Sequence, residues 1–251
     1  RGRGSTLIAP TVRAARQPAP SAFACNAGTS IAECDPGHAT IAGFHDGPEI
    51  GTGFHMQSSA RIVLAGGAGL VGQNLVVNLK HRGLANLVVL DKHAGNLAVL
   101  RQLHPDLVCE QADLAESGPW ERHLDGAEAV VMLQAQIGDL KIEPFVRNNV
   151  RSTEVILDAM AKFRVPYLVH ISSSVVQSVG DDYYTQTKRE QERIVIERGR
   201  RDDHAQIILR PTLMFGWFDR KHLGWLARFM RRIPVFPIPG NGRFMRQPLY
   251  V

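Results

Sequence analysis

The sequence lacks the features that mark membrane, disulfide-rich and nucleic-acid-binding proteins. No stretch of its 251 residues approaches the roughly 18 continuous apolar residues that a membrane-spanning helix requires. Its three cysteines, Cys25, Cys34 and Cys109, are odd in number and widely spaced, so they indicate neither a disulfide framework nor a metal site. The net charge of +5 is spread along the chain, without the concentrated basic patch or module motif of nucleic-acid binding. We therefore expect a cytoplasmic protein that acts on a small molecule and not on nucleic acid; the modest surplus of positive charge is compatible with an anionic small ligand.

Residues 1–55 lack the periodicity of helices and strands. Residues 1–28 contain no acid and are rich in Arg, Ser, Ala and Pro, which is the composition of a transit peptide. The following segment is glycine-rich and equally patternless. We favour the interpretation that residues 1–55 are a disordered or non-native leader ahead of Met56 and keep a transit peptide as the alternative.

Short apolar runs alternate with helical patterns from Met56 onward. Helices are expected near 70–81, 97–103, 144–163 and 184–197, and strands at 61–66, 87–91, 106–113, 127–133, 166–173 and 205–210. Continuous apolar strands separated by helices are typical of a parallel sheet covered on both faces. The sequence therefore predicts a doubly wound α/β (Rossmann) domain over residues 56–210. Residues 211–251 are expected to be the start of a small substrate-binding lobe in a truncated chain.

Three glycines, Gly66, Gly69 and Gly72, lie between the first expected strand and helix. A turn would explain them, but a strand–glycine–helix junction also lets backbone N–H groups and a helix N-terminus face a pyrophosphate. Asp91, at the end of the second strand, is suited to accept both hydroxyls of an adenosine ribose and to repel a 2′-phosphate. The pattern therefore favours NAD over NADP, and Asp113, after the third strand, is a weaker candidate for the adenine edge.

Tyr184 and Lys188 are four residues apart in the last expected helix and would share one face. A neighbouring ammonium favours the phenolate, so we expect Lys188 to lower the pKa of Tyr184 and make it a usable base. The alternative is a chance pairing on a surface helix. Ser172, Ser173 and Ser174 follow the fifth strand, at the sheet edge where ligands bind in such folds. A polar strand end satisfied by local backbone bonds is the alternative there.

These residues belong to a longer set of motifs that follow one another in a fixed order. They are "GGAGLVG" at 66–72, Asp91, "ADL" at 112–114, "NNVRST" at 148–153, "HISSS" at 170–174, "YTQTK" at 184–188, "LRPTLMFG" at 209–216 and "PGNGRFMRQPLYV" at 239–251. With these motifs, the chain from Met56 to Val251 resembles the extended short-chain dehydrogenase/reductase group, within the NAD-dependent epimerase/dehydratase family.

The resemblance implies a catalytic Ser/Tyr/Lys site made of Ser173, Tyr184 and Lys188, with Lys188 also holding the nicotinamide ribose hydroxyls. Ser174 stays open as the catalytic serine or as a substrate contact, because the register after the serines is loose. The cofactor-binding set that the resemblance implies is Gly66, Gly69, Leu70, Val71, Asp91, Asp113, Leu114, Leu133, Asn149, Tyr184 and Lys188. Asn149 matches an asparagine that supports the active site in the family.

The chain departs from the family pattern at several positions. Ser174 and Val175 stand where the sugar 4,6-dehydratases carry an Asp-Glu pair, so dehydration is disfavoured. Gln134 replaces an alanine after the fourth strand, and Leu213 replaces an asparagine of the sugar epimerases. Arg246 matches an arginine that is suited to bind a substrate diphosphate.

The function expected from these features is NAD-dependent epimerisation of a nucleotide-sugar-like substrate. One alternative is an NAD-dependent dehydrogenase or reductase of another hydroxyl or ketone substrate, and another is a non-catalytic NAD-binding assembly subunit. The family often forms homodimers through helices like 144–163 and 183–199, so a homodimer is also expected.

Overall fold

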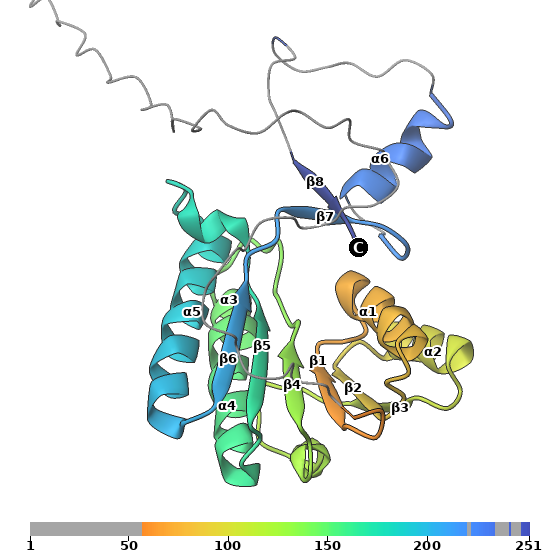
Figure 1. The fold of residues 1–251 in the computed structure, drawn as a ribbon. Helices are drawn as coiled ribbons and strands as arrows, with labels where there is room; N and C mark the ends of the chain where they lie inside the picture. The colour runs from red at the N-terminus through yellow and green to blue at the C-terminus, as the bar shows by residue number, and fades with distance from the viewer. Residues whose placement is uncertain (1–56, 220–221, 234–240, 242–246) are drawn as a thin grey trace, which may run out of the picture. The chain divides into compact units, whose positions relative to one another are not determined.

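A computed structural model describes residues 57–219, 222–233, 241 and 247–251 (Figure 1). The expected leader, residues 1–55, and the expected diphosphate ligand Arg246 lie outside the described residues.

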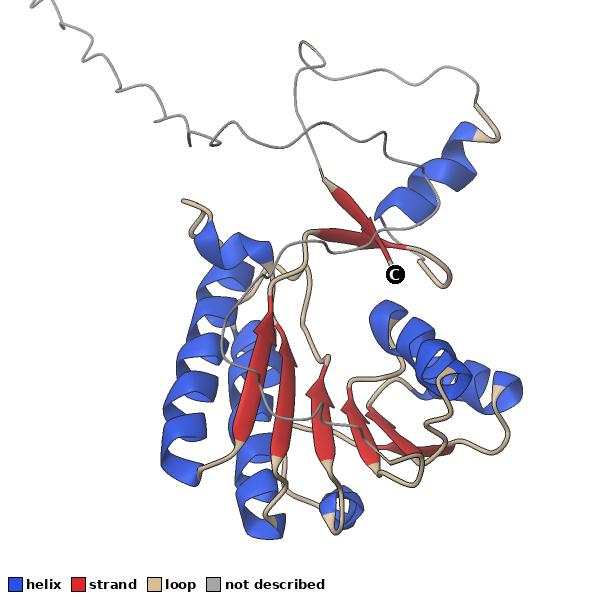
Figure 2. Cartoon of the chain, in the orientation of Figure 1, coloured by secondary structure: helices blue, strands red, loops and turns tan. Residues whose placement is uncertain are grey.

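Six parallel strands form the main sheet, with helices on both of its faces (Figure 2). The strand order is β3-β2-β1-β4-β5-β6, which is the order of a doubly wound dinucleotide-binding fold. The predicted fold class is therefore confirmed. The strands are β1 (Ile62–Ala65), β2 (Leu87–Asp91), β3 (Val108–Gln111), β4 (Ala129–Met132), β5 (Tyr167–Ile171) and β6 (Ala205–Leu209).

The central strand β1 has apolar side chains on both faces because helices cover both. Ile62 and Leu64 pack with residues of α1 (Leu70–His81) and α2 (Ala94–Leu103). Val63 and Ala65 pack with residues of α4 (Ser152–Phe163) and α5 (Tyr183–Asp202) on the opposite face. Burial on both sides explains why this strand reads as a continuous apolar run instead of alternating.

The helix expected over 144–163 contains a π-helical turn. It consists of α3 (Glu143–Phe145), the π-helical turn η2 (Val146–Arg151) and α4. The residues at the two junctions, Phe145, Val146, Arg151 and Ser152, are all in the right-handed helical region. Ser152 Oγ donates to the Asn148 carbonyl at 2.6 Å, and Thr153 Oγ1 donates to the Asn149 carbonyl at 2.7 Å. Ser and Thr hydroxyls often bond back to the carbonyl of the preceding turn, and single π turns of this kind are frequent at functional sites.

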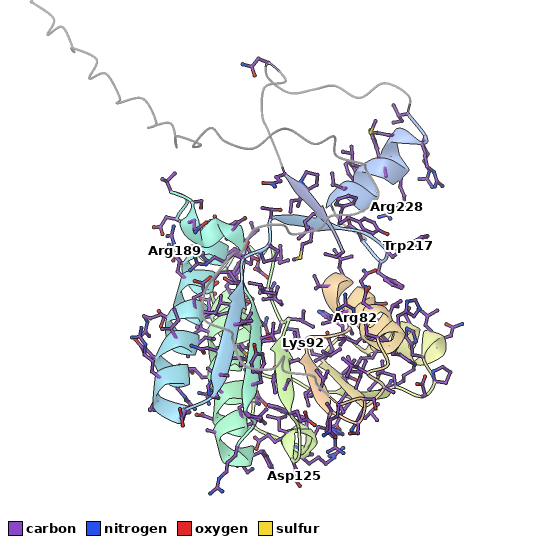
Figure 3. The ribbon with its side chains drawn as sticks, viewed as in Figure 1. Arg82, Lys92, Asp125, Arg189, Trp217 and Arg228 are labelled. Atoms are coloured by element: carbon purple, nitrogen blue, oxygen red, sulfur yellow. The ribbon has the colours of Figure 1, made fainter. Side chains whose placement is uncertain are left out.

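A second, two-stranded sheet follows the main one. Strand β7 (Leu213–Phe215) pairs in parallel with β8 (Pro248–Tyr250), and α6 (His222–Met230) lies between them in the chain. The loop after β7 carries Trp217, which is labelled in Figure 3. This loop contacts the first helix, because Asn74 Nδ2 donates to the Trp217 carbonyl at 2.9 Å. Short 3₁₀ turns, η1 (Pro119–Leu124) and η3 (Ser174–Gln177), complete the described elements.

The longest described helix, α5, is 20 residues long and rich in charged side chains. No helix among the described residues combines the length and the apolarity that crossing a membrane requires.

Gly72 fixes the distance between α1 and the turn that precedes it. A Cβ added at Gly72 would lie 2.5 Å from both the carbonyl carbon and the Cα of Gly67, and closer still to the carbonyl oxygen. Real Cβ atoms do not approach a backbone so closely, so any side chain here would force the helix away from the sheet.

We predict that Gly72→Ala lowers the free energy of unfolding by about 2 kcal/mol or more, because the added methyl group overpacks a rigid contact. Gly95→Ala is the matched control, since an added Cβ there meets nothing within 4 Å and Gly95 lies in α2. It should be neutral or raise the free energy of unfolding by up to about 1 kcal/mol. Urea denaturation measures both variants, and equal stabilities would contradict the prediction.

Candidate active site

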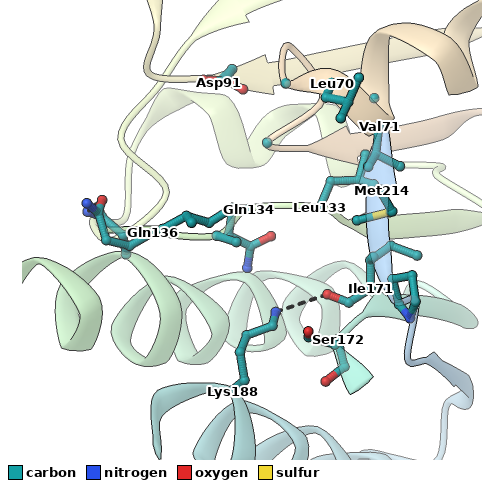
Figure 4. A pocket seen from close by; sticks show the side chains of 18 of the residues that line it. Leu70, Val71, Asp91, Leu133, Gln134, Gln136, Ile171, Ser172, Lys188 and Met214 are labelled. Carbon is teal, nitrogen blue, oxygen red and sulfur yellow. Dashed lines mark hydrogen bonds between the residues drawn. The ribbon is translucent and has the colours of Figure 1, made fainter. Parts of the chain in front are cut away.

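A cavity of about 1060 Å³ opens at the carboxyl ends of the parallel strands. This is the upper end of the size range of small-molecule sites, and it lies at the edge where doubly wound sheets bind ligands. The predicted site residues that line it are Gly66, Gly69, Leu70, Val71, Asp91, Asp113, Leu114, Leu133, Ser173, Ser174, Tyr184 and Lys188. Residues that are more than 120 positions apart in the chain thus share one cavity (Figure 4).

The glycine loop has the geometry that a phosphate cradle needs. Gly66 has a φ of +77°, and a Cβ there would lie 2.5 Å from the Gln134 backbone nitrogen. A Cβ at Gly69 would meet only the Gly66 carbonyl oxygen, at 3.7 Å, so the protein itself leaves room at this position. The free space beside the N-terminus of α1 fits the close approach of a pyrophosphate. Gly67 also has a packing reason, since its Cβ would lie 2.8 Å from the Leu64 Cβ, and the motif spacing did not single it out.

Asp91 ties the glycine loop to the end of β2. Its buried carboxylate accepts hydrogen bonds from the Ala68 N–H at 3.0 Å and from the His93 N–H at 2.9 Å. Each oxygen keeps a lone pair, and the residue lines the cavity. The residues present therefore fit NAD, with the glycine loop against the pyrophosphate and Asp91 against a ribose.

Asp113, which follows β3, lines the same cavity. Its carboxylate accepts from the Ala115 N–H at 3.0 Å and from Arg147 Nη2 at 2.8 Å. Burial raises the pKa of Asp113, but these hydrogen bonds outweigh it and hold the pKa below its ordinary value. Arg147 also binds Glu116 at 2.7 Å, and the sequence patterns did not point to it.

Tyr184 lies in the cavity wall with Ser173. Burial raises the pKa of the Tyr184 phenol above its ordinary value, although a hydrogen bond with Ser173 acts in the opposite direction. The net shift is therefore upward and not downward as expected from the spacing to Lys188, because burial dominates. Ser174 lines the cavity too, and its backbone N–H donates to the Pro211 carbonyl at 2.9 Å.

Lys188 is completely buried, and its amine is held by neutral oxygen atoms. Nζ donates to the Ile171 carbonyl at 3.0 Å and to Gln191 Oε1 at 2.9 Å. Burial lowers the pKa of Lys188 to about 7, although the Glu192 carboxylate acts to raise it. Buried His170, whose ring nitrogens have no hydrogen-bond partner among the described residues, has its pKa lowered first by burial and then by Lys188.

Asn149 is fully buried and is not among the residues that line the cavity. Its Oδ1 accepts from the Gln136 N–H at 2.7 Å, and its Nδ2 donates to Thr187 Oγ1 at 2.9 Å. It therefore joins the segment after β4 to the residue that precedes Lys188. This placement fits the supporting role that the family resemblance implies for Asn149.

An ion pair between Glu192 and Arg210 lies near Lys188 and was not predicted from the sequence. Glu192, one turn after Lys188, is buried and binds Arg210 through Nη2 at 2.6 Å and Nε at 2.9 Å. Burial raises the pKa of Glu192, but the bonds to Arg210 outweigh it and leave the pKa below its ordinary value. The Glu192 carboxylate therefore stays charged near Lys188.

One wall of the cavity, formed by the turn after β5 and by the segment around β7, is largely apolar. Val175, Leu213, Met214 and Phe218 line it, together with polar Ser174, Thr212 and Gln247. Asp219 also lines the cavity, and its carboxylate accepts from the Gly224 N–H at 2.8 Å.

We predict that the stability of the protein rises with pH between 7 and 9 because of Lys188. Above pH 7 the folded protein loses the Lys188 proton while the unfolded chain still binds it, and the stability therefore increases by up to about 1.4 kcal/mol per pH unit. In Lys188→Met this rise should disappear. Lys80→Met, which removes an amine paired with Asp106 at the surface, is the control and should keep the wild-type slope. Urea denaturation at pH 7, 8 and 9 measures the slopes, and parallel curves for Lys188→Met and wild type would refute the assignment.

Most of the chain is similar to known proteins. Residues 62–251 match the model of the NAD dependent epimerase/dehydratase family. Among curated proteins, the 3 beta-hydroxysteroid dehydrogenase/Delta 5-->4-isomerase of Mycobacterium tuberculosis is 28% identical over 184 residues, which is 64% of this chain and 48% of that protein. The chain thus spans about half the length of the curated relatives it matches.

Solved structures share the fold at low sequence identity. A UDP-glucuronic acid 4-epimerase from Bacillus cereus, in complex with UDP-glucuronic acid and NAD, has a TM-score of 0.65 and 21% identity, over 76% of this chain and 69% of that chain. A dTDP-glucose 4,6-dehydratase from Streptomyces venezuelae has a TM-score of 0.64 and 21% identity, over 76% and 68% of the two chains.

The match extends from the start of β1 to the last residue, which is well over half of the chain. It includes the glycine loop, Asp91 and the Tyr184–Lys188 pair, whose geometry has been described above. The prediction of NAD as the cofactor agrees with the family, which is NAD-dependent. The chain belongs to the NAD-dependent epimerase/dehydratase family.

Proposed function

We propose that this chain is the cofactor-binding and catalytic part of an enzyme that oxidises a secondary hydroxyl group to a ketone, with NAD as the hydride acceptor. The observation that carries the proposal is the convergence of Ser173, Tyr184 and Lys188 on one cavity that also contains the glycine loop and Asp91. NAD, when bound, supplies the site that accepts a hydride.

Tyr184 and Ser173 are proposed to bind the reacting oxygen. The Tyr184 oxygen takes the hydroxyl proton as the C–H hydride leaves, and the Ser173 hydroxyl hydrogen-bonds the same oxygen as it becomes a carbonyl. In the reverse direction the protonated phenol returns its proton to the ketone oxygen. The raised pKa of Tyr184 suits this second role at neutral pH.

Lys188 is proposed to support the base role of Tyr184. With a pKa of about 7, its amine takes up or gives up a proton near neutral pH. A protonated Lys188 favours the phenolate of Tyr184 electrostatically, and the helix holds the two residues one turn apart.

The first candidate substrate is a nucleotide-sugar-like compound, and the first candidate reaction is epimerisation. The ketone would be reduced again on its opposite face, which returns the cofactor unchanged. Several solved structures of similar fold are epimerases of this kind, which supports the candidate at the level of the fold. Ser174 and Arg246 are the proposed substrate contacts. Dehydration is disfavoured because Ser174 and Val175 offer no carboxylate pair.

A second candidate is a dehydrogenase of a hydroxyl compound with a less polar body. The apolar wall of Val175, Leu213, Met214 and Phe218 favours it, and Leu213 replaces an asparagine of the sugar epimerases. The curated hydroxysteroid dehydrogenases give independent support from sequence. A non-catalytic NAD-binding subunit is the least favoured alternative, because Tyr184 and Lys188 are both present.

We predict that Tyr184→Phe lowers kcat by at least about 100-fold and leaves the affinity for NAD within about twofold, because only the proton-transfer group is lost. Tyr183→Phe is the matched control. Its ring contacts Phe145 at a centroid distance of 6.1 Å and is not among the residues that line the cavity, so its kcat should be unchanged. Steady-state kinetics and calorimetric NAD titration measure the two effects. Full activity of Tyr184→Phe would refute the mechanism.

The two candidates differ in their cofactor balance. An epimerase should convert a nucleotide sugar without net NADH, whereas a dehydrogenase should form one NADH for each molecule of substrate oxidised. Absorbance at about 340 nm during turnover, with product analysis by NMR, separates the two reactions. We expect no accumulation of NADH with a nucleotide sugar, and stoichiometric NADH with any substrate would favour the second candidate.

A further inference from the structure

Thr153, on α4, orients two glutamine side chains through one buried hydroxyl group. Its Oγ1 donates its only proton to the Asn149 carbonyl at 2.7 Å, so only lone pairs remain for other partners. Gln191 Nε2 donates to this oxygen at 2.8 Å, and Gln134 Nε2 approaches it at 3.5 Å. Both amides therefore turn their NH₂ groups toward Thr153 and their carbonyl oxygens away from it.

The side-chain amide oxygens of Gln191 and Gln134 differ in their hydrogen bonding. Gln191 Oε1 accepts from the Lys188 amine at 2.9 Å. Gln134 Oε1 is buried and has no hydrogen-bond partner among the described residues. A buried acceptor without a partner is unfavourable, and rotating the amide by 180° would only exchange the problem for two unpaired N–H donors.

Gln134 lies between the glycine loop and Lys188. A Cβ at Gly66 would be 2.5 Å from the Gln134 backbone nitrogen, so the residue borders the loop that fits a pyrophosphate. Its side chain lines the cavity, and Figure 4 shows its amide directed toward Lys188. In a dinucleotide, the group that connects the pyrophosphate to the nicotinamide is a ribose, which carries two hydroxyl donors.

We propose that the amide oxygen of Gln134 accepts a hydrogen bond from a hydroxyl of the nicotinamide ribose when the dinucleotide binds. The proposal rests on the proposed function only in that the cavity binds NAD, and it is independent of the substrate. Gln134 stands where the family pattern has alanine, so this contact would be a property of this chain. The family resemblance assigns hydroxyls of the same ribose to Lys188, whose ammonium keeps one N–H beyond those bonded to Ile171 and Gln191.

The test compares two ligands that differ in this ribose. ADP-ribose carries the second ribose and no nicotinamide, whereas ADP ends at the pyrophosphate. In Gln134→Leu we expect the Kd for ADP-ribose to rise about 5- to 15-fold, as the loss of one hydrogen bond implies, and the Kd for ADP to stay within twofold. Gln134→Ala, the family residue, should give the same selective loss and guards against a folding defect of the leucine variant.

Gln111→Leu provides the matched control, because Gln111 is exposed at the end of β3 and is not among the residues that line the cavity. It should leave both affinities unchanged in isothermal titration calorimetry of the 251-residue chain. Unaltered ADP-ribose binding by both Gln134 variants would overturn the proposal. An equal loss for ADP would overturn it too, because the residue would then act through the pyrophosphate loop.

Titration with NAD separates the remaining outcomes. A loss for NAD without a loss for ADP-ribose would assign Gln134 to the nicotinamide ring and would overturn the ribose contact. If the wild-type chain bound neither NAD nor ADP-ribose, the proposed function itself would fail. If the wild type binds both and the variants do not differ from it, only the role of Gln134 is lost.

Discussion

The complete burial of the Lys188 amine is the constraint around which the candidate active site is organised. A lysine removed from water requires acceptors, and the protein provides the Ile171 carbonyl and the Gln191 amide instead of a directly bonded carboxylate. Neutral acceptors stabilise an ammonium less than an ion pair does, so burial dominates and the pKa decreases to about 7. The amine is thereby kept close to half-protonated at neutral pH.

The neighbouring polar residues follow from the same constraint. The NH₂ group of Gln191 donates a hydrogen bond to the Thr153 hydroxyl. Thr153 lies just after the π-helical turn that ends at Arg151, and this turn sets its position. Asn149, in that turn, holds the backbone of Gln136 on one side and Thr187 on the other. The π turn therefore connects the segment after β4 to α5, and a regular helix would rotate these residues away from one another.

The fold could be predicted from the sequence because its signals are local. Buried parallel strands read as apolar runs such as Leu87–Asp91, and the glycines from Gly66 onward mark the junction between a strand and a helix. The convergence of Asp91, Ser173, Tyr184 and Lys188 could be expected as well, because parallel strands place their carboxyl ends at one edge. The family pattern supplied the roles of these residues, whereas the structure supplies their positions.

The electrostatic state of the site could not be predicted, because it depends on contacts between distant segments. Spacing alone suggested that Lys188 acts on Tyr184, but the opposing effect of burial comes from the surrounding sheet and helices. The Glu192–Arg210 pair and the Gln191–Thr153 bond join residues 18 and 38 positions apart, and no periodicity reveals them. The π turn is equally hidden, since its residues have an ordinary helical pattern.

The opposite pKa shifts of Tyr184 and Lys188 have a joint consequence for proton transfer. Burial disfavours the charged form of each residue, which is the phenolate for tyrosine and the ammonium for lysine. Moving one proton from the phenol to the amine creates both charges together and leaves the net charge of the site unchanged. In a medium of low polarity the attraction between the two new charges is strong, and it offsets part of the cost of forming them. In molecules whose Lys188 amine is unprotonated, the neutral pair is thus able to produce a phenolate, provided that the substrate and cofactor keep water out of the cavity.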